Sequence, residues 1–384
     1  MKRQKRTLTK RIALGKIAIL PASMHFLTHR LSQKFIKTFK STRLACSTWR
    51  LSLVLSLTVL VSGSVFGQDP AFSQFQSLPM SVNPALAGNA GHGQMTLIFR
   101  DQWPEFPQSY VTYAIAWDQF FPRINSAFGV MALGDRQGNG VFNTHSLHGF
   151  YVYGVPLGQH SAIRLGMEFS WAQRGLRWED LRFFDQIDPV FGFNNPAGVL
   201  NPTGEVPPGD PSIHWFDAGA GAMIFNRKTY AGFSIRHLPR PNTAFYDGRE
   251  DRMPIAWSAQ AGARLPIGDN RRDPTVFSPY LLGIRQGDFS QARAGMRLGK
   301  GLVYGGTAFR YAFSPLGGTA DALIIEAGLR KNGFEMTYSY DVSVGPVAGQ
   351  SGGAHEIALR LRLTGEGARE AGRQRSESLR CPVF

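Results

Sequence analysis

The chain has 384 residues, and its 43 Gly, 12% aromatic content and 18% charged content are unusual for a soluble enzyme. They are typical of a β protein with many turns and aromatic bands. The net charge of +15 comes almost wholly from residues 1–50, which hold thirteen Lys or Arg and no acidic residue, and the near-neutral remainder excludes an electrostatic surface for nucleic acid.

The basic leader is followed by an apolar segment. Residues 51–67 carry no charge, and Val65 and Gly67 fit the −3 and −1 positions of a signal peptidase site, with Gln68 as the first mature residue. The alternative is a membrane anchor, but these 17 residues are short for a hydrocarbon core of about 30 Å. We therefore predict a basic leader and signal peptide over 1–67, and export through the inner membrane.

Residues 68–88, "QDPAFSQFQSLPMSVNPALAG", follow without a clear helix or strand period. The segment is polar, interrupted by Pro and rich in Phe and Gln. Because it lies directly before the first predicted strand, we expect 68–93 to form a plug or rim segment. Phe72, Phe75 and the Asn83–Gly88 turn are then expected to contact the folded body.

From about residue 94, apolar and polar residues alternate over spans of about ten residues, separated by Gly, Asn, Asp and Pro. In "AIRLGMEFSW", Ile163 and Leu165 share one face, whereas Arg164 and Glu168 share the other. A period of two is that of a pleated strand. Fourteen strands are predicted, starting near residues 94, 110, 126, 144, 162, 213, 229, 255, 275, 290, 302, 321, 333 and 355.

A soluble β-sandwich would show the same alternation, but three features favour a transmembrane antiparallel β-barrel over 94–364. The spans match the 9–11 residues that a tilted strand needs to cross a bilayer. A signal peptide delivers the chain beyond the inner membrane, where it would be an integral part of the outer membrane in contact with lipid. Aromatic rings near strand ends suit a headgroup belt; they are Trp117, Trp171, Tyr280 and Tyr340.

The predicted connections are of two kinds. Tight turns alternate with longer links such as 238–254, 266–274 and 341–354, and bacterial barrels place short turns in the periplasm and long loops outside. The longest interruption, 176–212, is rich in Pro, Gly and Asn and is predicted to be an ordered external loop or a segment folded into the lumen. A polar tail, 365–384, follows the last strand.

Signals for catalysis or metal binding are weak. "GQSGG" fits G-x-S-x-G with Ser351 in the nucleophile position, but that motif needs a strand-turn-helix context and here lies in a Gly-rich link. His145 and His148, three apart on a strand, face opposite ways and make a poor metal pair. Only Cys381 follows the signal peptide, which leaves no disulfide and no thiolate cluster. No catalytic, cofactor or metal site is predicted.

Several charged side chains fall on the second face of the predicted strands. Charge is costly against lipid but acceptable in a polar lumen. These side chains are predicted to form a network that fills or lines the barrel, or simply a solvated interior. They are Arg164, Glu168, Glu326, Arg330, Arg360 and Arg362.

Five strings occur in a recognisable order along the chain: "QDPAFSQF", "NPALAG", "RDQWP", "YSYDVS" and "SGGAHEIALR". Together they span roughly residues 68–363 and resemble the PorP/SprF family, outer-membrane proteins of the type IX secretion and gliding machinery of Bacteroidetes-type bacteria. The basic leader and the polar tail depart from that pattern. The residues that carry the resemblance near the N-terminus are Asp69, Pro70, Phe72, Ser73, Gln74, Phe75, Asn83, Pro84, Gly88, Arg100, Gln102, Trp103 and Pro104.

The resemblance implies a β-barrel that is not an enzyme and has no cofactor. Such a barrel works with the periplasmic ring components and the translocon of the type IX machinery. It supports export or surface attachment of cargo proteins that carry C-terminal sorting domains. The alternative reading of the same strands is an outer-membrane channel or transporter for small or hydrophobic solutes.

Overall fold

The computed structural model describes residues 69–158, 160–268, 274–314, 317–345 and 348–363. The predicted leader, signal peptide and polar tail lie outside these residues. In the part of the chain that is described, no helix is long and apolar enough to cross a membrane.

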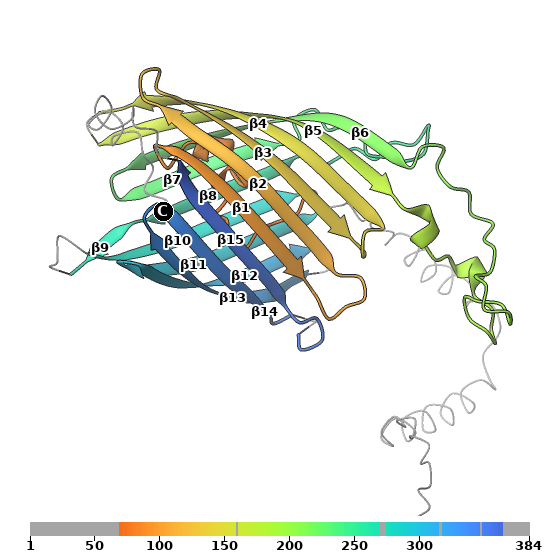
Figure 1. The fold of residues 1–384 in the computed structure, drawn as a ribbon. Coiled ribbons are helices and arrows are strands. Elements are labelled where there is room, and N and C mark those ends of the chain that lie inside the picture. Colours follow the sequence, from red (N-terminus) through yellow and green to blue (C-terminus); the bar gives the residue numbers. More distant parts are fainter. Residues whose placement is uncertain (1–68, 159, 269–273, 315–316, 346–347, 364–384) are drawn as a thin grey trace, which may run out of the picture. The chain divides into compact units, whose positions relative to one another are not determined.

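One antiparallel sheet dominates the fold, and its first and last strands meet (Figure 1). Gly93–Gln102 of the first strand pair with Leu363–Ala354 of the last, which closes the sheet into a barrel. The strands are β1 (Gly93–Gln102), β2 (Tyr110–Phe121), β3 (Ser126–Gln137), β4 (Phe142–Pro156), β5 (Ser161–Leu176), β6 (Ser212–Asn226), β7 (Thr229–Arg236), β8 (Ala256–Ala263), β9 (Leu265–Ile267), β10 (Thr275–Gln286), β11 (Phe289–Lys300), β12 (Val303–Ser314), β13 (Gly317–Lys331), β14 (Phe334–Ser343) and β15 (Ala354–Leu363).

The wall of the barrel has fourteen strands, because β8 and β9 are two parts of one. Both pair with β10, and only Arg264 separates them. Every other strand pairs with its neighbours in sequence, as in an up-and-down barrel. The predicted all-β barrel of about 14 strands is confirmed, and each predicted start lies within a few residues of the observed one.

The outer face of the barrel is apolar. On β5, the side chains of Leu165 and Phe169 are 52% and 62% exposed, whereas Arg164 and Glu168 on the opposite face are buried. This reverses the pattern of a soluble protein and is what a wall facing lipid requires.

Not every predicted belt aromatic lies on that outer face. Trp171 is 38% exposed and points outward, but Tyr280 is only 6% exposed. The ring of Tyr280 points inward and packs on Phe75, with 5.1 Å between ring centroids. The belt interpretation is therefore wrong for Tyr280, whose residue type suits an interface but whose strand register turns it into the lumen.

The two rims of the barrel carry different connections. The short-turn rim holds tight turns such as Asn332–Gly333 between β13 and β14. The long-loop rim holds 177–211 between β5 and β6, and 237–255 between β7 and β8. Grouping 266–274 with the outer loops is wrong, because each antiparallel step changes rim and β9 meets β10 at the short-turn rim.

The loop 177–211 contains two short 3₁₀ helices, η3 (Trp178–Asp180) and η4 (Phe184–Gln186). Most of its side chains are exposed, including large apolar ones such as Phe184 at 93% and Val190 at 79%. Of the two predicted alternatives, the exposed loop fits the structure and the segment folded into the lumen does not.

The N-terminal segment Asp69–His92 lies inside the barrel, and we call it the plug segment (Figure 1). It contains the 3₁₀ helices η1 (Pro79–Ser81) and η2 (Pro84–Leu86), and every residue from Phe72 to Met80 and from Val82 to Asn89 is buried. Its apolar side chains form two clusters with inward side chains of the wall. The lumen is therefore partly a hydrophobic core, which the inward charges predicted from the sequence share with the plug segment.

The outward apolar band generates a first prediction. Ile325 lies near the middle of β13 and is 51% exposed, and Leu329 lies on the same face close to the short-turn rim, 58% exposed. Ile325→Arg is expected to lower the free energy of unfolding by about 2–4 kcal/mol, and Leu329→Arg by about 0–1 kcal/mol, because the cost of a charge falls towards the interface. Reversible urea unfolding in lipid vesicles measures both. Equal losses would contradict the assignment of this face to lipid.

Candidate functional site

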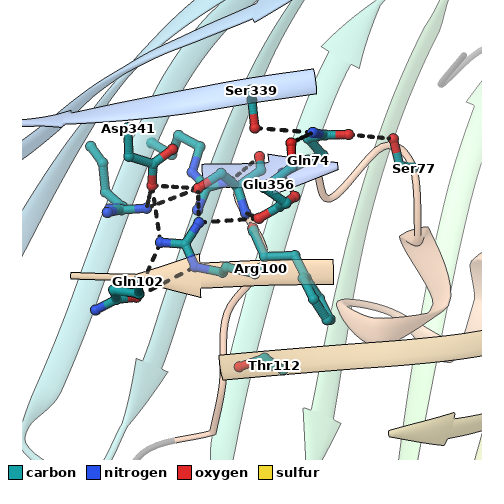
Figure 2. Close-up of polar contacts among 12 residues, drawn as sticks. Gln74, Ser77, Arg100, Gln102, Thr112, Ser339, Asp341 and Glu356 are labelled. Carbon is teal, nitrogen blue, oxygen red and sulfur yellow. Dashed lines mark hydrogen bonds and ion pairs between the residues drawn. The ribbon is translucent and has the colours of Figure 1, made fainter. Parts of the chain in front are cut away.

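A dense group of polar contacts between the plug segment and the wall surrounds Gln74 (Figure 2). The backbone N–H groups of Ser73 and Gln74 donate to the two carboxylate oxygens of Glu356 on β15, at 2.8 and 2.7 Å. The Gln74 side-chain amide donates to the Ser339 hydroxyl and to the Glu356 carbonyl, each at 3.0 Å. A carboxylate that accepts two backbone N–H bonds fixes the chain as well as the side chain.

Two guanidinium groups bind Glu356 and a second buried carboxylate, Asp341. Arg100 donates to Glu356 at 3.1 Å, to Asp341 at 3.0 Å and to the Ser73 hydroxyl at 2.7 Å. Arg310 donates to Asp341 at 2.8 Å and also pairs with Asp321. The Ser73 hydroxyl in turn donates to Asp341 at 2.6 Å. The plug segment thus completes an ion network between β1, β12, β14 and β15.

A third guanidinium binds the plug backbone directly. Arg293 on β11 is 2% exposed, and one of its N–H groups donates to the carbonyl oxygens of Phe72 and Ser73, at 3.1 and 2.6 Å. Burying this many charges is costly unless each is paired or hydrogen-bonded. Phe72 and Ser73 supply acceptors to Arg293, so removing the segment would take these acceptors from a buried cation. Arg100 and Arg310 would keep their carboxylate partners on the wall.

The start of the plug segment is held at the long-loop rim. The Asp69 carboxylate accepts from His237 at 2.8 Å and from Arg236 at 3.3 Å, and the Asp69 N–H donates to Gln286 at 2.9 Å. His237 follows β7, has a positive φ of 59°, and binds Asp217 through its other ring nitrogen. The imidazole therefore lies between two carboxylates.

This arrangement changes two pKa values. Burial alone lowers the pKa of His237, but the Asp69 carboxylate and the hydrogen bonds to Asp217 and Asp69 outweigh it and raise the pKa to about 10. Burial alone raises the pKa of Asp69, but His237 and then Arg236 outweigh it and hold the pKa well below its ordinary value. Both groups are thus charged near neutral pH, and the ion pair fixes the start of the plug segment.

The middle of the plug segment crosses to the opposite wall. The Val82 carbonyl accepts from the hydroxyls of Ser234 and Ser258, at 2.8 and 3.0 Å. The Asn83 amide donates to the carbonyls of Ala222 and Phe233, at 3.3 and 3.2 Å. Its carbonyl oxygen accepts from the Ala85 N–H at 2.9 Å and so caps η2.

Two wall glycines give the turn its space. A Cβ at Gly166 on β5 would lie 2.6 Å from the Ala85 Cα, and a Cβ at Gly221 on β6 would meet the Asn83 side chain. Any larger residue at either position would overlap the plug backbone or Asn83. Glycine in a strand often marks a site where another backbone segment approaches closely, because it has no side chain to block the approach.

The end of the plug segment meets the wall near the short-turn rim. The Gly88 N–H donates to Asp118 on β2 at 2.5 Å, and Arg164 on β5 donates to the Ala87 carbonyl. The contacts with Asp69 lie at the long-loop rim and those with Gly88 near the short-turn rim. The plug segment therefore runs the length of the lumen before the chain turns back into β1.

The predicted residues of "RDQWP" lie at the C-terminal end of β1 and in the β1–β2 turn. Arg100 belongs to the ion network and also donates to Gln102 at 3.1 Å. The Trp103 N–H donates to the Gly353 carbonyl at 2.8 Å, which ties the β1–β2 turn to the β14–β15 loop. Pro104 lies beside Gly352 in the same loop. The string thus joins the plug network to the long-loop rim.

The predicted lumen charges all point inward but do not form one cluster. Arg164 contacts the plug segment, and Glu168 pairs with His148 at 2.7 Å. Glu326 accepts from Arg297 at 2.7 and 2.9 Å. The remaining three lie towards the short-turn rim, and they are Arg330, Arg360 and Arg362.

The weak catalytic and metal signals have structural roles. The Ser351 hydroxyl is buried in the β14–β15 loop, donates to Ser343 at 3.2 Å and accepts from the Gly353 N–H. His145 faces outward and His148 inward, so strand geometry separates them. Among the described residues, no group of three or more His, Cys, Asp or Glu could hold a metal ion.

Sequence reasoning missed several residues that hold the plug segment. Asp341 lies within "YSYDVS" and Glu356 within "SGGAHEIALR", so the strings contained them without showing their role. Arg293, Arg310 and His237 lie outside every string. The available signal was that Asp341, Glu356, Arg293 and Arg310 fall on inward positions of strands, where each needs a partner.

The sequence profile of one protein family, described as type IX secretion system membrane protein PorP/SprF, matches residues 64–361. The chain belongs to this family. The match spans the plug segment and almost the whole barrel, so the contacts described above lie within the PorP/SprF region. Among curated proteins, no sequence matches the chain.

Solved structures with similar folds are distant in sequence from this PorP/SprF chain. The toluene transporter TbuX of Ralstonia pickettii is 12% identical, with a TM-score of 0.41 over 75% of this chain and 94% of that one. BamA from Haemophilus ducreyi lacking POTRA domains 1–3 is 9% identical, with a TM-score of 0.36 over 71% and 70%.

The glycine contacts predict how the plug segment can be displaced. Gly166→Val is expected to force the Asn83–Leu86 turn away from the wall while the barrel still assembles, because the overlap is with the plug backbone. Conductance in planar bilayers should rise from a closed to an open level. Gly175→Val is the matched control, since it lies on the same strand with its nearest atom at 4.0 Å. A closed Gly166→Val barrel would contradict the contact.

The Asp69–His237 pair predicts a pH dependence of plug anchoring. The raised pKa of His237 contributes stability that is fully present below its ordinary value of 6.5 and is lost as pH rises towards about 10. The lowered pKa of Asp69 contributes stability that is present above its ordinary value of 3.8 and is lost in stronger acid. Anchoring is therefore strongest between these two values.

Hydrogen exchange of the backbone at 69–74, corrected for intrinsic rates, measures this anchoring. Protection should fall between pH 6.5 and 10 in the wild type, and His237→Gln should remove that slope. A slope that persists in His237→Gln would assign the pH dependence to another group.

Proposed function

We propose that this PorP/SprF chain is a plugged outer-membrane barrel that docks cargo for the type IX machinery at its outer surface. The observation that supports this best is the plug segment, which runs through the lumen from rim to rim. It is held by polar contacts at Asp69, Ser73, Asn83 and Gly88. A lumen filled in this way suits a scaffold that engages partners at its rims. It suits an open channel for small solutes less well.

In this proposal the long-loop rim faces outward and the short-turn rim faces the periplasm, as the usual asymmetry of outer-membrane barrels predicts. The partners are the periplasmic ring and translocon components on the inner side and cargo with C-terminal sorting domains on the outer side. The barrel supports export or surface attachment of that cargo and performs no chemistry itself.

The loop 177–211 is the proposed docking surface for cargo. It exposes large apolar side chains on the long-loop rim, where no barrel wall covers them, and exposed apolar patches of this kind mark protein contacts. The five largest exposures are Phe184 at 93%, Val190 at 79%, Val206 at 71%, Val199 at 60% and Phe191 at 55%.

The test is Phe184→Asp combined with Phe191→Asp. Truncating apolar anchors at an interface costs about 1–4 kcal/mol each, so surface cargo is expected to fall by about tenfold or more. The readout is the abundance of proteins with C-terminal sorting domains on intact cells, measured by surface biotinylation and mass spectrometry. Unchanged cargo with a normally assembled barrel would contradict this docking surface.

Two controls accompany this experiment. Leu238→Asp with Val344→Asp places the same charges on exposed apolar residues of the long-loop rim outside this loop, 45% and 43% exposed, and should leave surface cargo unchanged. Glu250→Cys in the 237–255 loop should react with an impermeant maleimide on intact cells, whereas Arg227→Cys in the β6–β7 turn should not. Reversed labelling would overturn the orientation.

A further inference from the structure

A cavity lies inside the barrel between the plug segment and the short-turn rim, and we call it the basic vestibule. Its volume is about 760 Å³, within the range of ligand-binding sites. The plug segment forms one side of it through Leu86 and Asn89, and the β13–β14 turn at the short-turn rim forms another. Whatever enters the vestibule from that rim would therefore touch the plug segment.

The lining of the basic vestibule is strongly cationic. Five basic side chains face two carboxylates, those of Asp118 and Glu335. Both carboxylates already have partners in the chain, because Asp118 accepts from the Gly88 N–H and Glu335 pairs with Arg360. An excess of positive charge with low-dielectric walls concentrates anions. The basic residues are Arg264, Arg330, Lys331, Arg360 and Arg362.

The positions of these cations indicate which class of anion the basic vestibule would bind. Arg264 lies between β8 and β9, whereas Arg330 and Arg362 lie on β13 and β15, several strands away around the wall. Charges spread around a cavity of this size suit several linked carboxylates better than one phosphate. Arg330, Arg360 and Arg362 stand on inward positions of their strands, so the barrel wall separates them from lipid headgroups outside. Lys331 stands on the outward face of β13 at the edge of the short-turn rim.

The chain's own tail does not have the complementary charge. The sequence after Leu363 contains four Arg and three Glu. An acidic segment of another protein, entering from the short-turn rim, fits the charge, the volume and the route of entry.

We infer that the basic vestibule binds an acidic peptide segment of a periplasmic partner and brings it against the plug segment. This deepens the proposed function, because it rests on the short-turn rim facing the periplasm. Charged anchors around a shared cavity would act together, so binding is expected to weaken steeply with salt.

The test uses the purified mature chain in detergent micelles and fluorescently labelled hexaglutamate, with hexaglutamine as the neutral peptide. Fluorescence anisotropy should show that hexaglutamate binds and hexaglutamine does not. Arg330→Gln combined with Arg362→Gln should weaken hexaglutamate binding by about tenfold or more. Arg249→Gln combined with Arg252→Gln removes the same charge from the long-loop rim and should change nothing. Circular dichroism verifies that each variant keeps its strands.

Three outcomes would overturn the inference. They are no binding of hexaglutamate to the wild type, equal weakening by both double variants, and binding of tripolyphosphate without binding of hexaglutamate. The last would assign the vestibule to a phosphate ligand. Because the assay contains no cargo, its failure leaves the cargo-docking experiment untouched, and failure of that experiment leaves this one untouched.

Discussion

The structure depends on how a fourteen-stranded barrel fills its interior. Closing the sheet removes every strand edge, but it leaves inward-facing side chains that need partners. Here the chain's own residues 69–92 provide them. The backbone and hydroxyl of Ser73, together with the carbonyl of Phe72, contact three guanidinium groups and two carboxylates that the wall turns into the lumen.

The plug segment also links the two rims of the barrel. At the long-loop rim it is held by an ion pair, in the middle by hydrogen bonds from Asn83, and near the short-turn rim by Asp118 and Arg164. The same segment thus has one end at the long-loop rim, where Asp69 binds His237, and lines the basic vestibule with its other end.

The barrel could be predicted from the sequence because the constraint on it is local. A wall between lipid and lumen imposes a period of two on every strand, as in the alternation of Leu165 and Phe169 with Arg164 and Glu168. The plug segment has no such period, because residues such as Phe75 and Leu86 are surrounded on all sides and no face meets solvent. The plug segment was predicted only from its location in the sequence, directly before the first strand.

The partners of the plug segment were harder to predict. Register decides that Tyr280 faces Phe75 and not the headgroups, and that Arg293 reaches the Phe72 carbonyl from a strand more than two hundred residues away. Such contacts depend on which strands lie opposite each other across the lumen, and single-strand patterns do not contain that information. The role of the wall glycines at 166 and 221 could not be predicted either. Each leaves space for the plug turn at Asn83, and only the three-dimensional structure shows that this turn packs against them.

The most direct test of the plugged lumen is a disulfide between the plug segment and the wall. A Cβ at Gly129 on β3 would lie 3.4 Å from the Ala87 Cβ, close to the 3.5–4.5 Å typical of a disulfide. In a Cys381→Ser background, Ala87→Cys with Gly129→Cys should crosslink almost completely in outer membranes, as mass spectrometry of linked peptides would show. Ala87→Cys with Gly149→Cys, on the outward face of β4, should stay reduced. Two free thiols in the first pair would contradict the account.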